Sequence, residues 1–183
     1  MKSNIERPWI ETGYELFSKE GPGALKIDKL ARKVGVSRSS FYYLFADLDV
    51  FEEKLLAYHA CRAQGAAEKV KMCKAIEPDF LLLIMAEKDY VLFNRQLRVH
   101  RDNPRYKVGF ESAIALVGQE TMNIFTEMLE LQRKPEVARS VFQMTADILF
   151  HRLTVGNFNY EWLKDFMLEI KLLVKDMNRG GQE

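Results

Sequence analysis

Residues 24–56 carry two short amphipathic segments that meet at Gly35, and a longer helical segment follows at once. In the first segment Leu30, Ala31 and Val34 fall at i, i+1 and i+4, so they share one face of a short helix. Gly35 can adopt the positive φ with which helices often end. This spacing predicts two short helices packed across a tight turn, which is a helix-turn-helix.

The second short helix is expected to begin after Ser37, a residue type that caps helix N-termini. Val36, just before it, is expected to fill the corner between the two helices. Phe41, Leu44 and Phe45 follow at i, i+3 and i+4, so the second helix would bury their shared face against the first.

The remaining side chains of the second helix are left on its free face. Arg38 and Ser39 open the helix with hydrogen-bond donors and acceptors, and Tyr42 and Tyr43 follow. In a helix-turn-helix this end of the second helix meets base edges, while a phenol such as that of Tyr42 suits a phosphate oxygen. The segment therefore predicts DNA binding; the alternative is an ordinary surface helix with solvated side chains.

Charge supports DNA binding only locally. Residues 26–45 hold five basic residues and one acid, Asp28, a local balance of +4, whereas the whole chain has a net charge of +1. A local patch is sufficient for several phosphate contacts, and binding should then depend strongly on salt. The basic residues are Lys26, Lys29, Arg32, Lys33 and Arg38.

The run from Pro8 to about Tyr58 resembles the DNA-binding domain of the TetR family of bacterial transcriptional regulators. The resemblance rests on a first helix that ends in FSKEG, on the run LARKVGVSRSSFYYLF, and on a further helix after Asp47. In the first helix, the resemblance rests on Tyr14, Leu16 and Phe17.

The resemblance implies DNA contacts for seven residues. Ser37 and Tyr42 would touch the DNA backbone, and Lys26 could meet a phosphate through its ammonium group. The residues at or near the bases would be Arg38, Ser39, Ser40 and Tyr43.

Three positions depart from the family pattern. Lys26 stands where a Thr or Ser commonly opens the second helix, and it cannot cap that helix. Leu44 stands where a His is frequent, and Leu48 stands where a Lys or Arg usually opens the fourth helix. We therefore expect two fewer backbone contacts than the family pattern provides, and a modest operator affinity.

The rest of the chain is predicted to be helical throughout, because no strand or hairpin signal interrupts it. We expect an all-α fold of about nine helices. Residues 1–47 would form a three-helix helix-turn-helix domain, and residues 48–183 a helical ligand-binding and dimerisation domain. At 183 residues and 48% hydrophobic, the chain can bury a substantial core as two closely packed parts.

The last two predicted helices each carry a wide apolar face and are joined by a short loop. Two such hairpins around a two-fold axis would form a four-helix bundle, as the resemblance also implies. The homodimer would present its two recognition helices to half-sites of a palindromic operator in double-stranded DNA. Alternatively, both helices complete the core of one protomer. The interface residues we predict are Val141, Met144, Ile148, Trp162, Phe166, Ile170 and Val174.

The middle of the chain mixes aromatic residues with methionines, which is typical of an apolar cavity and also of plain core. The resemblance implies that this region binds a small-molecule effector, of unknown identity. We expect no cofactor. The pocket residues we predict are Tyr58, Phe80, Ile84, Tyr90, Phe93, Arg98, His100, Phe110, Met122, Phe125 and His151.

A cluster of four arginines lies around the start of a predicted helix at Asn103. Guanidinium groups and helix N-termini both favour anions, so an acidic effector is one interpretation. The other is a solvated charged face paired with Glu87, Asp89 and Asp102. The four residues are Arg95, Arg98, Arg101 and Arg105.

Catalysis and metal binding find little support. The motifs HExxH, GxSxG, GxGxxG and Walker A do not occur, and the three histidines are scattered. His59 and Cys61 lie two residues apart on opposed sides of a helix, so they do not form a chelate. We expect a non-enzyme without a metal site. The rival hypothesis is a helical small-molecule or metal sensor whose helix-turn-helix is not used for sequence-specific DNA binding.

Composition also bears on location. Cys61 and Cys73 lie twelve residues apart on one predicted helix, where they cannot bridge each other, and two thiols without a disulfide framework suit a reducing compartment. No apolar run approaches the ~18 residues that a membrane span needs, and no signal peptide is recognisable. We expect a bacterial cytoplasmic protein, associated with the nucleoid and without a membrane partner.

Overall fold

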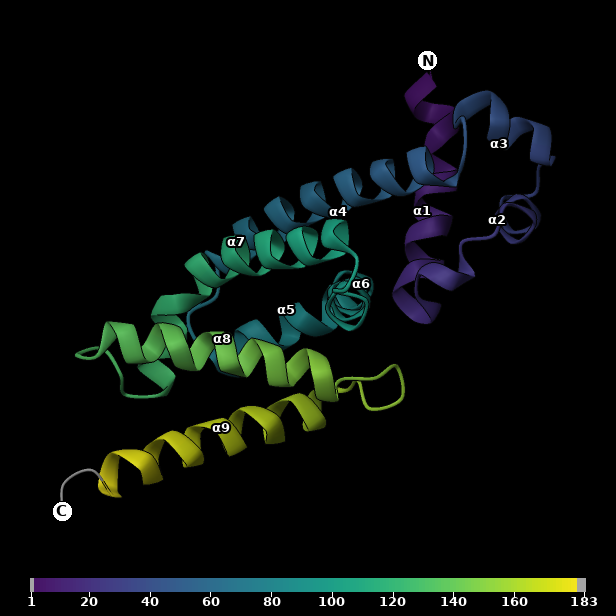
Figure 1. Ribbon diagram of the computed structural model, residues 1–183. Helices are drawn as coiled ribbons and strands as arrows, with labels where there is room; N and C mark the ends of the chain where they lie inside the picture. Colours follow the sequence, from purple (N-terminus) through teal and green to yellow (C-terminus); the bar gives the residue numbers. More distant parts are fainter. Residues whose placement is uncertain (1, 181–183) are drawn as a thin grey trace.

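The computed structural model describes residues 2–180, with side chains from residue 5 to residue 177, and this part of the chain is helical without a strand (Figure 1). Residue 1 and residues 181–183, the outer ends of the two predicted domains, lie outside it. The predicted all-α fold is confirmed over the described residues. In chain order the elements are α1 (Lys2–Glu20), η1 (Pro22–Ala24), α2 (Ile27–Val34), α3 (Arg38–Leu44), α4 (Leu48–Val70), η2 (Ile76–Phe80), α5 (Leu81–Ala86), α6 (Lys88–Val99), α7 (Pro104–Met128), α8 (Pro135–Arg152) and α9 (Tyr160–Gly180).

Helices α2 and α3 form the predicted helix-turn-helix. Gly35 ends α2 in the left-handed region, with φ 82° and ψ 27°, and its backbone N–H donates to the carbonyl of Ala31 at 2.9 Å. Leu30 and Ala31 are buried, whereas Val34 is half-buried. Val36 is 43% exposed, so the prediction that it fills the corner is wrong. The turn is held by backbone geometry and not by an apolar plug.

Four aromatic rings fill the core beneath the helix-turn-helix. Trp9, Phe41, Phe45 and Phe51 are each at most 1% exposed. The ring centroids of Trp9 and Phe41 lie 5.4 Å apart, and those of Phe45 and Phe51 lie 5.0 Å apart. At Gly13 a Cβ atom would come within 2.5 Å of the Phe51 ring, so α1 and α4 approach too closely for a side chain there. Because Phe51 belongs to α4, the first turn of that helix completes the N-terminal core.

Helix α1 also packs along α6, which is seen nearly end-on beside it in Figure 1. The Phe93 ring of α6 stacks on Tyr14 at 4.3 Å and on Phe17 at 4.2 Å. The Ser18 hydroxyl donates to the backbone carbonyl of Asp89 at 2.9 Å. The N-terminal helices are therefore docked on the C-terminal part through rings and hydrogen bonds.

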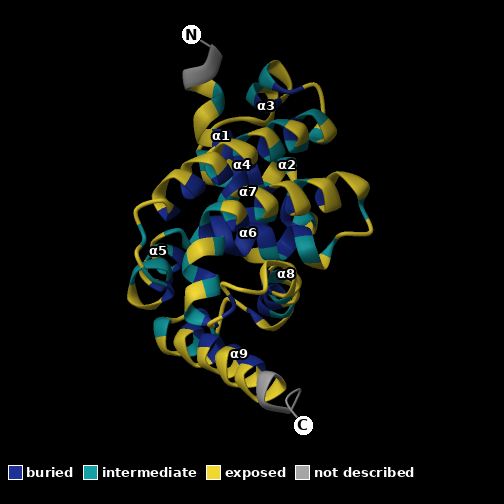
Figure 2. Cartoon of the chain, turned by 90° about the vertical axis from the view of Figure 1, so that its left-hand side faces the viewer, coloured by how far each residue is buried: buried dark blue, intermediate teal, exposed yellow. Residues whose placement is uncertain are grey.

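In the C-terminal part, α4 lies beside α7, α8 packs on α6 and α7, and α9 packs on α5 (Figure 1). Helices α8 and α9 run antiparallel and are joined by an ion pair of 2.8 Å between Arg152 and Glu169. Phe166, Ile170 and Val174 are at most 6% exposed and belong to the protomer's own hydrophobic core. Figure 2 shows that α9 is buried along one edge and exposed along the other. The structure therefore places these three residues inside the protomer and not on its surface, where the predicted dimer interface would lie.

Candidate nucleic-acid interface and internal cavity

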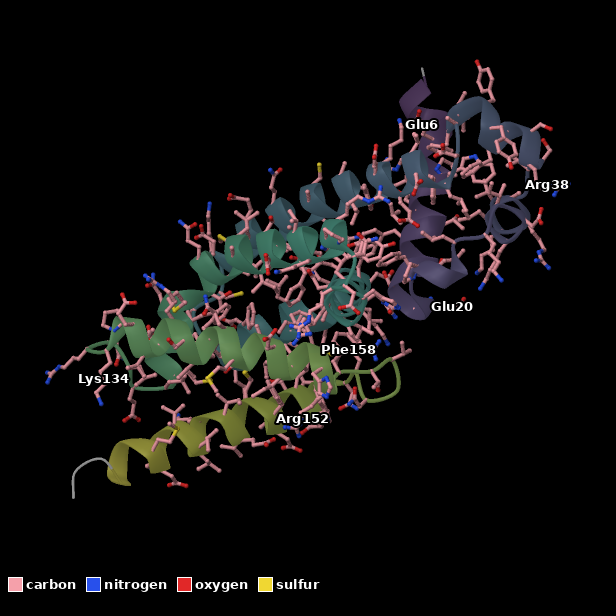
Figure 3. The ribbon with its side chains drawn as sticks, viewed as in Figure 1. Glu6, Glu20, Arg38, Lys134, Arg152 and Phe158 are labelled. Atoms are coloured by element: carbon pink, nitrogen blue, oxygen red, sulfur yellow. The ribbon has the colours of Figure 1, made fainter. Side chains whose placement is uncertain are left out.

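Helix α3 presents a polar and aromatic free face. Phe41 is fully buried and anchors the helix, while Tyr42 is 58% and Tyr43 is 74% exposed. Arg38 and Ser39 are exposed in the first turn, and Arg38 lies at the outer edge of the helix-turn-helix (Figure 3). The predicted contact residues on α3 thus share one accessible face, whose geometry suits a DNA groove.

The ion pairs around this face are weak. A guanidinium nitrogen of Arg38 lies 3.1 Å from a carboxylate oxygen of Asp28, and both side chains are more than two-thirds exposed. Exposed pairs of this kind contribute little, so Arg38 can exchange Asp28 for a base or a phosphate. Lys26 is exposed at the N-cap position of α2, where it makes no capping hydrogen bond.

Ser37 occupies the predicted N-cap position of α3, yet its side chain does not cap the helix. Its hydroxyl instead lies 3.2 Å from the hydroxyl of Ser40. The backbone position was predicted correctly, and the predicted capping bond is absent. Both hydroxyl groups stay at the accessible start of the helix, where the resemblance places DNA contacts.

Leu44 and Leu48 are the two departures from the family pattern on this side of the domain. Both are half-buried and pack against the hydrophobic core. The chain therefore uses for packing the two positions at which the resemblance implied a histidine and a basic residue. Neither side chain can donate a hydrogen bond to a phosphate.

An internal cavity of about 90 Å³ lies among helices α4 to α9. Its walls are almost entirely apolar, and its polar side chains include Asn94, Thr121 and Thr145. Four of the eleven predicted pocket residues line it, namely Phe80, Ile84, Tyr90 and Phe125.

Most polar groups of the cavity wall have partners within the protein. The Thr121 hydroxyl donates to the carbonyl of Val117 at 2.8 Å. The Asn94 amide donates to the carbonyl of Tyr90 at 3.1 Å. Among the described residues, the Tyr90 hydroxyl is the buried side-chain group that has no hydrogen-bond partner. Burial raises the pKa of Tyr90 to about 12, so the phenol stays neutral.

Glu87 is the ionisable carboxyl group at the cavity wall. Burial opposes its ionisation, but hydrogen bonds from Lys69 and Arg62 outweigh burial and lower the pKa of Glu87. The Arg62 guanidinium lies 2.7 Å from one carboxylate oxygen, and Lys69 contacts the other. The negative charge of Glu87 is therefore balanced by two basic side chains that do not line the cavity.

A buried chain of hydrogen bonds connects the cavity wall to α1. The Tyr14 hydroxyl and His59 Nδ1 lie 2.8 Å apart, and His59 Nε2 lies 3.2 Å from Asn94 Oδ1. The neutral imidazole that donates from Nε2 and accepts at Nδ1 satisfies both bonds. Burial, the largest influence, lowers the pKa of His59 to about 3, which keeps the ring neutral. No local sequence pattern predicts this chain of hydrogen bonds, because its members lie far apart in the sequence.

The other seven predicted pocket residues lie elsewhere. Arg98, Phe110 and Met122 line an open groove of about 960 Å³ between α7 and α8. Tyr58 lines a shallow surface pocket, and Phe93 packs against α1. The two remaining residues are histidines: His100 Nδ1 lies 2.9 Å from the carbonyl of Gln96, and His151 is exposed.

Three of the four arginines of the cluster are paired, and their partners differ from the predicted ones. Arg98 donates to Asp147 at 2.7 Å, and Arg105 donates to Asp49 at 3.1 Å. Arg95 donates to the carbonyl of Leu153. None of these arginines lines the apolar cavity, which disfavours the acidic effector at that site.

The described residues contain neither a metal-ligand cluster nor a membrane-spanning helix. No group of three or more His, Cys, Asp or Glu side chains within them could hold a metal ion. Cys61 is an exposed free thiol and Cys73 a half-buried one. None of the described helices is both long and apolar enough to cross a membrane.

Residues 10–47 match the family model described as bacterial regulatory proteins, tetR family. The N-terminal domain is that of the TetR family. The matched range begins within α1 and ends at the cap of α4, so it covers the helix-turn-helix. The match therefore concerns the DNA-binding domain at the N-terminus and supports a role in transcriptional regulation.

A solved structure from Mesorhizobium loti MAFF303099, assigned to the TetR-family transcriptional regulators, shares the fold. Its TM-score is 0.59 at 13% sequence identity, and the match covers 96% of each chain. The similarity therefore includes the C-terminal helices, which the family model does not reach. No curated protein matches the chain in sequence.

Proposed function

We propose that this TetR-type protein is a ligand-responsive repressor, which binds a palindromic operator as a homodimer in the bacterial cytoplasm, at the nucleoid. The observation that carries the proposal is the free face of α3. It exposes Arg38, Ser39, Tyr42 and Tyr43 above a rigid aromatic core. A rigid helix with exposed donors is what major-groove readout requires.

The surface of the α8/α9 hairpin supports a homodimer. On α8, Met144 is 61% exposed and Val141 and Ile148 are half-buried, which leaves an apolar stripe open to solvent. On α9, Leu173 is 54% and Met177 is 69% exposed. Adjacent apolar side chains on a surface favour self-association, and a two-fold axis would pair the two hairpins.

The buried hydrogen-bond chain supports coupling between effector and DNA. Asn94 lines the cavity and, through His59, holds Tyr14 of α1. A ligand that shifts α6 would therefore act on the first helix of the DNA-binding domain. An effector needs only to prefer one spacing of the two recognition helices over the other.

The test begins with the selection of genomic fragments that the wild-type protein binds, followed by titration of variants on the selected DNA. Arg38→Ala should weaken binding by about five- to a hundredfold and relax base preference, as expected for loss of a base contact. Tyr42→Phe should weaken binding uniformly across sequences and leave base preference unchanged. Arg139→Ala is the control, because Arg139 is similarly exposed and pairs with Glu136 within α8. Parental binding by both α3 variants would contradict the proposal.

A second candidate is a helical small-molecule sensor that does not use its helix-turn-helix on specific DNA. The packing of Leu44 and Leu48 against the core favours it, because a leucine side chain cannot donate a hydrogen bond to a phosphate. Such a protein would bind a ligand in the cavity but yield no enriched genomic fragment.

A further inference from the structure

The cavity combines aromatic walls with one unsatisfied polar group. Phe80, Phe125 and Phe142 approach it from η2, α7 and α8. The Phe125 and Phe142 rings meet edge to face, with centroids 5.2 Å apart. A surface of this kind favours a flat, apolar ligand.

The Tyr90 hydroxyl is the polar group that a ligand could satisfy. Tyr90 lines the cavity, is 6% exposed, and has no hydrogen-bond partner in the described part of the chain. An unpaired buried hydroxyl is unfavourable, and an acceptor atom on a ligand would remove that cost. The Asn94 amide also favours the ionised phenol of Tyr90, but an N–H can donate only to the phenol oxygen, so the O–H proton stays available for a ligand acceptor. The Thr121 hydroxyl already donates to a backbone carbonyl.

The charges around the cavity argue for an uncharged ligand. No Arg, Lys or His is present among its described lining residues, so a buried carboxylate would stay uncompensated. Glu87 is held by Arg62 and Lys69, so a ligand cation would have to compete with two existing partners.

The cavity is too small for more than one ring, and a single ring would require one of the lining side chains to move. Its volume is about 90 Å³, below the ~150 Å³ of an engineered apolar cavity that binds benzene. The half-buried Phe142 lines both the cavity and the open groove between α7 and α8, together with Ile114, Gly118 and Ala146. A shift of this ring would admit a slightly larger molecule.

We propose that the cavity binds a compact, uncharged, single-ring molecule with one hydrogen-bond acceptor, which receives the Tyr90 hydroxyl. This proposal depends on the proposed function in one respect, because it treats the cavity as the effector site. The ring would lie among Phe80, Phe125 and Phe142, and the acceptor would face α6. Since the Asn94 side chain also donates to the backbone carbonyl of Tyr90, a ligand held by Tyr90 acts on the α6 turn that begins the hydrogen-bond chain to α1.

The test uses three probes of similar size that differ in polarity: acetophenone, ethylbenzene and benzoate. Each is titrated by calorimetry into the full chain in the absence of DNA. Acetophenone should bind more tightly than ethylbenzene, by about three- to tenfold for one net hydrogen bond, and benzoate should bind most weakly. Tyr90→Phe should abolish the preference for acetophenone while leaving ethylbenzene binding unchanged. Tyr58→Phe is the matched control, because Tyr58 lines only a surface pocket, and it should keep the preference.

Three outcomes would overturn the inference. They are an unchanged acetophenone preference in Tyr90→Phe, benzoate binding at least as tight as that of acetophenone, and no binding of any probe at millimolar concentration. Circular dichroism confirms that each variant is folded. Because no DNA is present, failure here leaves operator binding untouched, and loss of operator binding leaves this result untouched.

Discussion

The hydroxyl of Tyr14 lies 2.8 Å from Nδ1 of His59, and this bond ties α1 to α4 inside the protein. Both side chains are at most 3% exposed. The opposite nitrogen of the same imidazole faces Asn94 on α6. One neutral ring therefore joins three helices, two of which carry the cavity wall and one of which belongs to the DNA-binding domain.

Removal of the Tyr14 hydroxyl should destabilise the protein. Tyr14→Phe keeps the ring stacked on Phe93 but leaves His59 Nδ1 buried without a partner. We expect a loss of about 1–3 kcal/mol in the free energy of unfolding, measured by urea denaturation. Tyr43→Phe, at a position that is 74% exposed, should change it by less than ~0.5 kcal/mol. Equal stability of the two variants would mean that the Tyr14 bond contributes nothing.

Stability should fall in mild acid because of His59. Its pKa drops from 6.5 to about 3 on folding, so between these values the unfolded chain binds a proton that the folded protein does not. The folded state therefore loses stability as pH falls from 6.5 toward 3, by up to about 1.4 kcal/mol per pH unit, and this contribution is constant above that window.

The variant His59→Gln should flatten the pH dependence of the unfolding free energy between pH 4 and 6, in urea melts done at about half-unit steps. His151→Gln is the control, because His151 is exposed, and its slope should equal that of the parent. Parallel slopes for His59→Gln and the parent would rule out His59 as the source of the acid sensitivity.

Two helical glycines should respond oppositely to alanine. A Cβ at Gly118 would lie 2.5 Å from the Phe142 ring, whereas a Cβ at Gly65 would meet nothing within 4 Å. Gly118→Ala should force the ring aside and cost about 1–3 kcal/mol. Gly65→Ala should stabilise α4 by up to about 1 kcal/mol, since alanine is the better helix former. Thermal melts of the two variants against the parent distinguish the effects, and a stabilised Gly118→Ala would show that Phe142 moves freely.

The proposed dimer can be tested at two positions of equal exposure. Met144 on α8 and Val108 on α7 are both 61% exposed. Met144→Lys should weaken the dimer at least about tenfold by placing two charges at the symmetric interface. Val108→Lys should leave the dimer intact, and at protein concentrations where the parent is monomeric both variants should unfold within ~0.5 kcal/mol of it. Sedimentation equilibrium measures the association, and a Met144→Lys dimer as tight as the parent would place the interface elsewhere.

The helix-turn-helix was predictable because its information is local. The spacing of Leu30, Ala31 and Val34, the turn at Gly35 and the anchor at Phe41 all lie within a few residues of one another. Even there, the sequence does not say whether a half-exposed position such as Val36 is covered. Its exposure depends on the angle at which two helices diverge.

The cavity and the C-terminal interface depend on contacts between distant segments. Phe166, Ile170 and Val174 form the apolar stripe expected of α9, but periodicity cannot tell a stripe that faces the protomer from one that faces a partner. Likewise, Phe93 is an aromatic residue of the kind that often lines a pocket, but it packs against α1. Two arginines of the cluster form ion pairs with residues on other helices, namely Asp147 and Asp49.

The position of Phe51 has a practical consequence for hybrid regulators. A junction placed at residue 47, where the sequence suggests a domain boundary, would separate Phe41 and Phe45 from the ring of α4 that covers them. The foreign helix joined there would have to supply an equally large ring opposite Gly13. A hybrid that exchanges DNA specificity between this protein and another regulator should therefore have its junction within α4, beyond Leu55. Each DNA-binding domain then keeps the first two turns of its own α4.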